Sequence, residues 1–184
     1  MDMIADRNIL ISKAENSRLN ELNLDNIPFG KYFTDHMLEA DYENGEWTNV
    51  EIKPYQPLVI NPSLSAIHYG QSIFEGIKAY KDDAGKISIF RPQDNYKRFN
   101  NSAQRLCMPE VPEWIFMEGM RQLLNIDIKW VSDRPGYSLY IRPFMFNAEE
   151  FIGVNPGGRF KFLIILSPAG KYYNAPVKIF VEEE

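Results

Sequence analysis

The chain has 184 residues, of which 45% are hydrophobic and 24% are charged, and this balance is typical of one globular domain. The net charge is −5 with no cluster of Lys and Arg, which argues against a nucleic-acid partner because phosphate neutralisation needs concentrated positive charge. A single cysteine and two histidines exclude an intrachain disulfide and argue against a structural zinc site.

The N-terminal sequence has no basic start followed by a long apolar stretch, as a secretory signal would. No apolar run approaches the ~18–20 residues of a membrane-spanning helix. We therefore expect a cytoplasmic protein that is not inserted in a membrane. Residues 1–28 are mostly polar and weakly periodic. We interpret them as an N-terminal arm that precedes a domain covering residues 29–184.

The first part of that domain reads as strands. Two strand-like runs flank Asn44-Gly45 within residues 33–60, and this pair predicts a β-hairpin because it favours the tight turns that match strand twist. Residues 67–80 predict a further strand region. After a turn at 81–86, residues 87–90 predict a short strand.

Two helices follow. Pro92 suits the first helical position, and Asp94 places a carboxylate in the first turn, where it favours the helix dipole. Residues 113–130 predict the second helix. Each helix has an apolar stripe at three- and four-residue spacing. The stripes comprise Tyr96, Phe99, Ala103 and Leu106 on the first helix and Phe116, Met120, Leu123 and Leu124 on the second.

The clearest strand patterns lie near the end of the chain, at residues 136–146 and 159–168, with the turn "NPGG" between them. We expect "PVKIFVEEE", residues 176–184, to form a last strand. The order of strands, two helices and strands predicts an α+β fold with a largely antiparallel sheet and two packed helices.

Two arginines are candidates for anion binding on the first helix. Arg98 and Arg105 are seven residues apart and therefore lie near one face. The planar fork of an arginine donates two hydrogen bonds at once to a phosphate or carboxylate. The spacing alone is equally compatible with a solvated face that carries salt bridges.

Tyr140 and Arg142 are two residues apart in a strand and point to the same side. Their neighbours are almost all apolar, and an arginine in such a run needs an anion because an unpaired buried charge is very costly. The anion is either a bound ligand or a core carboxylate such as Glu75.

Tyr69 and Phe74 flank Gly70, where a bulge or kink could bring both rings to one cavity. The alternative is that both are core aromatic residues. We expect His36 and His68 to be structural histidines with satisfied hydrogen bonds. The sequence has no glycine-rich phosphate loop and no G-x-S-x-G nucleophile elbow.

Five segments occur in a distinctive order: "HYGQSIFEGIKAY", "FRPQDNYKRFNNSAQRLCMP", "SLYIRPF", "GVNPGG" and "LSPAGKYY". Together they resemble the branched-chain amino acid aminotransferases, which are pyridoxal 5'-phosphate enzymes of fold-type IV. The resemblance covers about residues 29–184 and implies the small N-terminal domain of that fold. It implies transfer of an amino group between Leu, Ile or Val and 2-oxoglutarate, so that the partners would be small amino acids and 2-oxo acids.

The resemblance also implies roles for single residues. Arg98 matches the arginine that binds the cofactor phosphate, and Tyr140 and Arg142 match the pair that recognises substrate carboxylates. The matched walls of the substrate pocket are Phe29, Tyr69, Phe74, Gly76, Val154 and Tyr172. In the family Tyr69 and Val154 are offered to the site of the partner subunit, which implies a homodimer. No metal is implied.

The family's catalytic lysine, which forms a Schiff base with the cofactor, follows a strand like "PVKIFVEEE" and would lie beyond Glu184. Lys161, Lys171 and Lys178 do not match its motif. We therefore expect this chain to be inactive alone and not to bind the cofactor tightly. Three other readings stay open. Two are enzymes of the same fold, a D-amino acid aminotransferase or an aminodeoxychorismate lyase, and one is a non-catalytic binding or dimerisation module.

Overall fold

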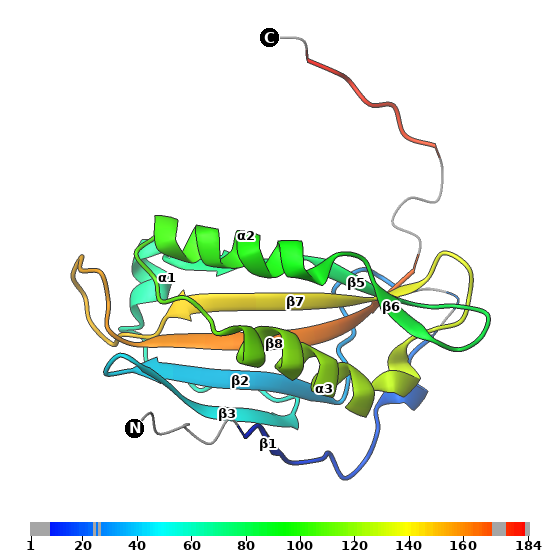
Figure 1. Ribbon diagram of the computed structural model, residues 1–184, viewed down its shortest axis with the longest axis horizontal. Helices are drawn as coiled ribbons and strands as arrows, with labels where there is room; N and C mark the ends of the chain where they lie inside the picture. The colour runs from blue at the N-terminus through cyan, green and yellow to red at the C-terminus, as the bar shows by residue number, and fades with distance from the viewer. Residues whose placement is uncertain (1–7, 24, 26, 171–175, 183–184) are drawn as a thin grey trace, which may run out of the picture.

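A computed structural model describes residues 8–23, 25, 27–170 and 176–182. The described chain forms one curled sheet of eight strands, with helices packed across one of its faces (Figure 1). The prediction of an α+β fold with a largely antiparallel sheet is confirmed.

Seven strands follow the order β1-β3-β2-β8-β7-β5-β6, and β4 pairs separately with β7. Every pairing is antiparallel except that of β1 with β3. The strands are β1 (Leu10–Ile11), β2 (His36–Glu43), β3 (Glu46–Pro54), β4 (Ser72–Phe74), β5 (Ile77–Lys81), β6 (Ile87–Ile89), β7 (Ser138–Asn147) and β8 (Phe160–Ala169).

The predicted hairpin is β2 and β3. Asn44 and Gly45 both have positive φ, 55° and 86°, as this type of tight turn requires. Strands β7 and β8 form the long central pair and stay in register from Ser138 opposite Ala169 to Asn147 opposite Phe160. Side chains alternate between the two faces of a strand, so one face of β7 enters the core and the other stays open.

The helices lie on the core side of the sheet. They are α2 (Pro92–Arg105), a π-helical turn (Trp114–Glu118), α3 (Gly119–Ile126) and two short 3-10 helices (Leu19–Glu21 and Ile128–Trp130). Gly119 lets α3 approach β2 closely, because a Cβ at this position would be 2.3 Å from Leu38 Cδ1. The predicted stripes are buried except for Tyr96, which is half-buried, and Leu106, which is exposed where α2 ends.

Two predicted strand assignments are wrong. Residues 65–69 form a short helix, α1 (Ser65–Tyr69), which ends at Gly70 with φ +70°. The strand pattern resumes only at β4. Residues 176–182 have no regular secondary structure and are exposed, although their sequence is strand-like. A strand needs a neighbour to satisfy its backbone N–H and C=O groups, and no strand of the described chain pairs with this segment.

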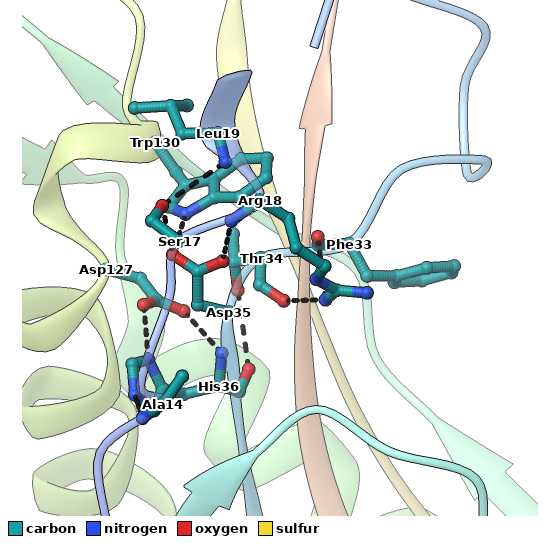
Figure 2. Close-up of polar contacts among 10 residues, drawn as sticks. All are labelled: Ala14, Ser17, Arg18, Leu19, Phe33, Thr34, Asp35, His36, Asp127 and Trp130. Atoms are coloured by element: carbon teal, nitrogen blue, oxygen red, sulfur yellow. Dashed lines mark hydrogen bonds and ion pairs between the residues drawn. The ribbon is translucent and has the colours of Figure 1, made fainter. Parts of the chain in front are cut away.

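The N-terminal arm packs against the domain. Ile9 is buried in the core, and β1 adds to the edge of β3. Beyond β1, a network of buried polar groups fastens the arm at residues 14–18 (Figure 2). The Ala14 N–H donates to His36 Nε2 at 2.8 Å, so this nitrogen carries no proton. The other ring nitrogen, Nδ1, therefore donates to Asp127 at 2.6 Å. His36 is a structural histidine, as predicted.

Replacement of Asp127 by alanine is expected to lower the free energy of unfolding by about 2–4 kcal/mol, because two buried donors lose their acceptor. These donors are the backbone N–H and Nδ1 of His36. Urea unfolding measures the change, and Asp133→Ala, at an exposed position, is the control. Hydrogen exchange at Ala14 should also become faster. A loss below about 1 kcal/mol would contradict this account of the arm.

Asp35 predicts how stability depends on pH. Burial opposes its charge, but hydrogen bonds from Ser17, the Arg18 N–H and Trp130 hold the pKa of Asp35 below its ordinary value. A lowered folded-state pKa stabilises the fold above the unfolded value of about 3.9. This stability is lost as the pH falls through the folded value. We expect urea midpoints to fall below pH ~4 and to fall less in Asp35→Asn. An unchanged pH profile in this variant would contradict the assignment.

Candidate active site

Four of the predicted substrate residues meet on the open face of the sheet. Tyr140 and Arg142 point outward from β7, and Phe74 points outward from β4, which pairs with it. Gly76 lies between β4 and β5. The neighbouring β7 residues Leu139 and Ile141 face the core and are fully buried. The alternation of the strand therefore separates the candidate site from the core.

The Arg142 guanidinium lies between two aromatic rings. Nη2 and Nε donate to the Tyr140 hydroxyl at 2.7 and 3.2 Å. Its Cζ lies 4.2 Å from the centroid of the Phe74 ring, within the range of a cation–π interaction. The alternative of a salt bridge between Arg142 and Glu75 is wrong, because Glu75 binds Arg98 instead. Within the described chain, Arg142 has no carboxylate partner and can accept one from a ligand.

Phe29 and Gly76 shape the surroundings of Tyr140. The Phe29 ring contacts the Tyr140 ring edge to face, with centroids 5.0 Å apart. At Gly76 a Cβ would be 2.6 Å from the Tyr140 hydroxyl oxygen, so any side chain there would displace it. Phe29, Phe74, Gly76, Tyr140 and Arg142 thus form one cluster, which we call the aromatic site.

Arg98 lies on α2, on the other side of the strand break at residues 75–76. Its Nε and Nη2 donate to the two Glu75 oxygens at 2.6 and 2.7 Å. The Arg98 side chain is 66% exposed, whereas that of Glu75 is 6% exposed. Burial opposes the charge of Glu75, but hydrogen bonds from Arg98 and Asn95 hold its pKa below the ordinary value. A buried anion therefore orients an exposed cation.

Arg98 and Arg105 line one shallow depression of about 540 Å³, with Ile73, Asn101, Ser102 and Leu106 as its other walls. The predicted proximity of the two arginines is confirmed. They differ in support, because Arg98 is held by Glu75 whereas Arg105 has no hydrogen bond or ion pair with any described residue. An anion at this depression would meet one fixed and one mobile guanidinium.

The other predicted residues lie away from the aromatic site. Tyr69 ends α1, and Val154 lies in the loop between β7 and β8, where it is 88% exposed. The two segments are tied by a bridge between Leu64 and Glu150. Figure 1 shows both segments at the same end of the sheet. The predicted kink that would bring Tyr69 beside Phe74 is absent, because Tyr69 is helical. Tyr172 lies outside the described residues.

Sequence patterns did not reveal two residues near the site. Ser167 lies opposite Tyr140 in β8, is buried, and its hydroxyl has no hydrogen-bond partner among the described residues. A lone hydroxyl in the apolar run "FLIILSPAG" was its only signal. Asn95 donates to Glu75 at 2.9 Å, and its place one turn before Arg98 was the available signal. Among the described residues, no group of acidic, histidine or cysteine side chains could hold a metal ion.

No family model matches the chain. Curated proteins do. The chain is 49% identical over 167 residues to a probable branched-chain-amino-acid aminotransferase of Staphylococcus aureus, and the match covers 88% of this chain and 46% of that protein. The chain is a homologue of the branched-chain-amino-acid aminotransferases. Branched-chain-amino-acid transaminase 1 of Bacillus subtilis is 45% identical over 163 residues, with 86% and 46% covered. The chain thus spans about half the length of these aminotransferases.

Solved structures agree on the fold. The branched-chain amino acid aminotransferase of T.th., in complex with N-(5'-phosphopyridoxyl)-L-glutamate, matches with a TM-score of 0.52 and 26% identity over 72% of this chain and 40% of that chain. The aminotransferase of Thermoproteus uzoniensis matches with a TM-score of 0.57 and 20% identity over 76% and 43%. The prediction of a fold-type IV small domain is confirmed by these aminotransferase structures. No helix in the described part of the chain is long and apolar enough to cross a membrane.

Proposed function

We propose that the chain is the small domain of a pyridoxal-phosphate-dependent branched-chain amino acid aminotransferase. The whole enzyme would move an amino group between Leu, Ile or Val and 2-oxoglutarate. The observation that carries the proposal is the 49% identity to such an aminotransferase over 88% of the chain. The aromatic site adds physical support, since it combines apolar walls with one cation that no carboxylate of the described chain neutralises.

In this proposal the aromatic site holds the substrate side chain. Phe29, Phe74 and Tyr140 offer ring surfaces to an isobutyl or isopropyl group, which gains from leaving water. Arg142 stays near the rings when the substrate is aliphatic. When glutamate binds, Arg142 donates to its distal carboxylate, and the Tyr140 hydroxyl keeps the guanidinium oriented. One pocket can then serve both the apolar donors and the acidic donor.

The residues around Arg98 fit the phosphate end of pyridoxal phosphate. The fork of Arg98 is exposed, is oriented by Glu75, and opens on the depression that Arg105 also lines. When bound, this cofactor withdraws electrons from the substrate α-carbon. Arg98 would hold the phosphate, and the aromatic site would orient the substrate side chain beside it.

A homodimer is part of the proposal. One end of the domain carries an unusual density of exposed apolar side chains, which favours coverage by another protein surface. These side chains are Val59, Ile60, Ile67, Tyr69, Phe151, Ile152 and Val154. They include both residues that the resemblance assigns to the site of the partner subunit.

Substrate profiling tests the proposed function. In a full-length enzyme that contains this chain, amino transfer to 2-oxoglutarate should be faster from L-leucine, L-isoleucine and L-valine than from D-alanine. Faster transfer from D-alanine would favour a D-amino acid aminotransferase. Release of pyruvate from aminodeoxychorismate would favour the lyase. Absence of every activity would favour a non-catalytic module.

The Arg98→Ala variant of the full-length enzyme is expected to lose about ten- to a hundredfold in cofactor affinity, because one hydrogen bond to a charged group contributes ~1.5–3 kcal/mol. Arg105→Ala should lose less. Arg105 has no partner among the described residues and must be immobilised when it binds, which costs side-chain entropy. Titration of both apoenzymes with pyridoxal phosphate measures the difference. Equal losses would mean that the wrong arginine has been assigned.

A further inference from the structure

Glu75 is a buried carboxylate whose hydrogen bonds come from groups around the strand break. It is 5% exposed. One oxygen accepts from Arg98 Nε, and the other accepts from Arg98 Nη2 and from Asn95 Nδ2. The backbone N–H of Gly76 also bonds to the carboxylate. A carboxylate that is bonded on both oxygens has one orientation, and it imposes one orientation on the arginine that it binds.

The pairing leaves part of Arg98 available to a ligand. A guanidinium has five N–H groups. Glu75 accepts two of them, so three remain, and the side chain is two-thirds exposed. The free groups belong to the end of the fork that points away from Glu75. A phosphate would therefore meet a guanidinium that is already oriented.

Glu75 also connects the two subsites. Phe74 and Gly76 belong to the aromatic site, whereas the side chain of Glu75 between them points to α2. Its backbone N–H donates to the carbonyl of Pro143 at 2.9 Å, which keeps the strand break against β7. Three consecutive residues thus set the position of the substrate walls and of the arginine on the helix.

We propose that Glu75 is the positioning residue of the cofactor site, which orients Arg98 for the phosphate through a carboxylate fork supported by Asn95. This inference rests on the proposed function, because it assumes that Arg98 binds the phosphate. The negative charge of Glu75 weakens the attraction of Arg98 for anions. The structure favours orientation as the larger effect, since a preorganised fork loses less freedom on binding.

The test compares two ligands that differ only in the phosphate. Dissociation constants for pyridoxal phosphate and for pyridoxal are measured by absorbance titration of the full-length apoenzyme. In Glu75→Gln the new amide NH₂ faces the N–H donors of Arg98 or Asn95, so the fork is released. We expect pyridoxal phosphate to bind about tenfold more weakly and pyridoxal to bind as before.

Arg98→Lys completes a double-mutant cycle. It keeps the charge and removes the fork. If Glu75 acts through Arg98, the double variant should bind pyridoxal phosphate no more weakly than the weaker single variant. Asn95→Ala removes one support of Glu75 and should cost about threefold. It tests the inference even if Glu75→Gln does not fold, because an unchanged affinity in Asn95→Ala would then overturn the inference.

A matched control lies on the other helical segment. Glu118 accepts the fork of Arg121 and the amide of Gln122, as Glu75 does with Arg98 and Asn95. Glu118→Gln should leave both dissociation constants unchanged, because this pair is exposed and lines neither subsite.

The outcomes separate the two proposals. If Arg98→Lys discriminates between the ligands but Glu75→Gln does not, the inference is overturned and the role of Arg98 stands. Tighter binding of pyridoxal phosphate by Glu75→Gln would also overturn it, since the carboxylate would then compete with the phosphate. Equal losses for both ligands, or additive effects in the double variant, would reduce Glu75 to a structural residue. If Arg98→Lys changes neither constant, the proposed phosphate role fails, and the inference fails with it.

Discussion

Replacing Arg142 by methionine in the full-length enzyme is expected to reduce kcat/KM for glutamate on the order of a hundredfold or more, while kcat/KM for leucine changes little. The distal carboxylate of glutamate must enter the same aromatic site that takes the isobutyl group of leucine. Without Arg142 this carboxylate would be desolvated and unpaired, at a cost of about 2–5 kcal/mol. Leucine does not present a second carboxylate to the site.

The geometry explains why leucine should tolerate the change. Arg142 contacts the Phe74 ring at 4.2 Å and the Tyr140 hydroxyl at 2.7 Å, and it forms no ion pair with another described residue. Methionine keeps most of the side-chain volume, so the rings retain a neighbour and the walls keep their shape. The variant therefore removes one charge and leaves the apolar surface almost unchanged.

Single-turnover measurements of the two half-reactions give the answer separately for leucine and glutamate. Arg159→Met is a suitable control, because Arg159 is an exposed arginine that lies 3.6 Å from Glu43, away from the aromatic site. If leucine loses as much as glutamate, Arg142 holds the α-carboxylate or supports the fold. Its assignment to the distal carboxylate would then be wrong.

The 184-residue chain alone is expected to catalyse no amino transfer. Transfer needs a lysine that attacks the cofactor as a neutral amine. Burial favours the neutral amine at Lys161, but hydrogen bonds to Asp41 and Glu39 raise its pKa. At Lys53, hydrogen bonds to Glu39 and Glu51 likewise outweigh burial and raise the pKa. Both amines therefore stay charged. Lys178 lies in an exposed segment without regular secondary structure.

Glutamate formation from leucine, 2-oxoglutarate and added pyridoxal phosphate measures this prediction. Lys78 is the essential control, because it is exposed and pairs in register with Tyr140 at the aromatic site. Turnover that disappears in Lys78→Ala would contradict the prediction and identify Lys78 as the amine. Turnover that is equal in the chain, in Lys78→Ala and in Arg98→Ala would come from a contaminating aminotransferase.

The sequence predicted most of the local structure. Asn44-Gly45 identified the β2–β3 hairpin, because these residues tolerate the positive φ of its turn. Pro92 and the apolar spacing identified α2, and alternation identified β7 and β8. These signals are local, so they do not depend on which segments pair. The order of the motifs also led to the aminotransferase family, which the curated relatives bear out.

Where a strand or a charge needed a distant partner, the sequence left the outcome open. The segment 176–182 has a strand pattern, yet it forms no strand because no described strand pairs with it. The arm looked weakly structured, yet β1 extends the sheet beside β3. Hydrophobic pattern favours an extended conformation, but only a neighbouring edge can satisfy its backbone hydrogen bonds.

The sequence alone determined the family, the strands and helices with strong local signals, and the set of candidate residues. Only the tertiary structure decided their pairing. It gave Glu75 to Arg98 and left Arg142 between Tyr140 and Phe74. Both arginines are compatible with the same carboxylate in the sequence. The break between β4 and β5 turns Glu75 towards α2 and away from the open face, and this geometry leaves the Arg142 cation available to a ligand.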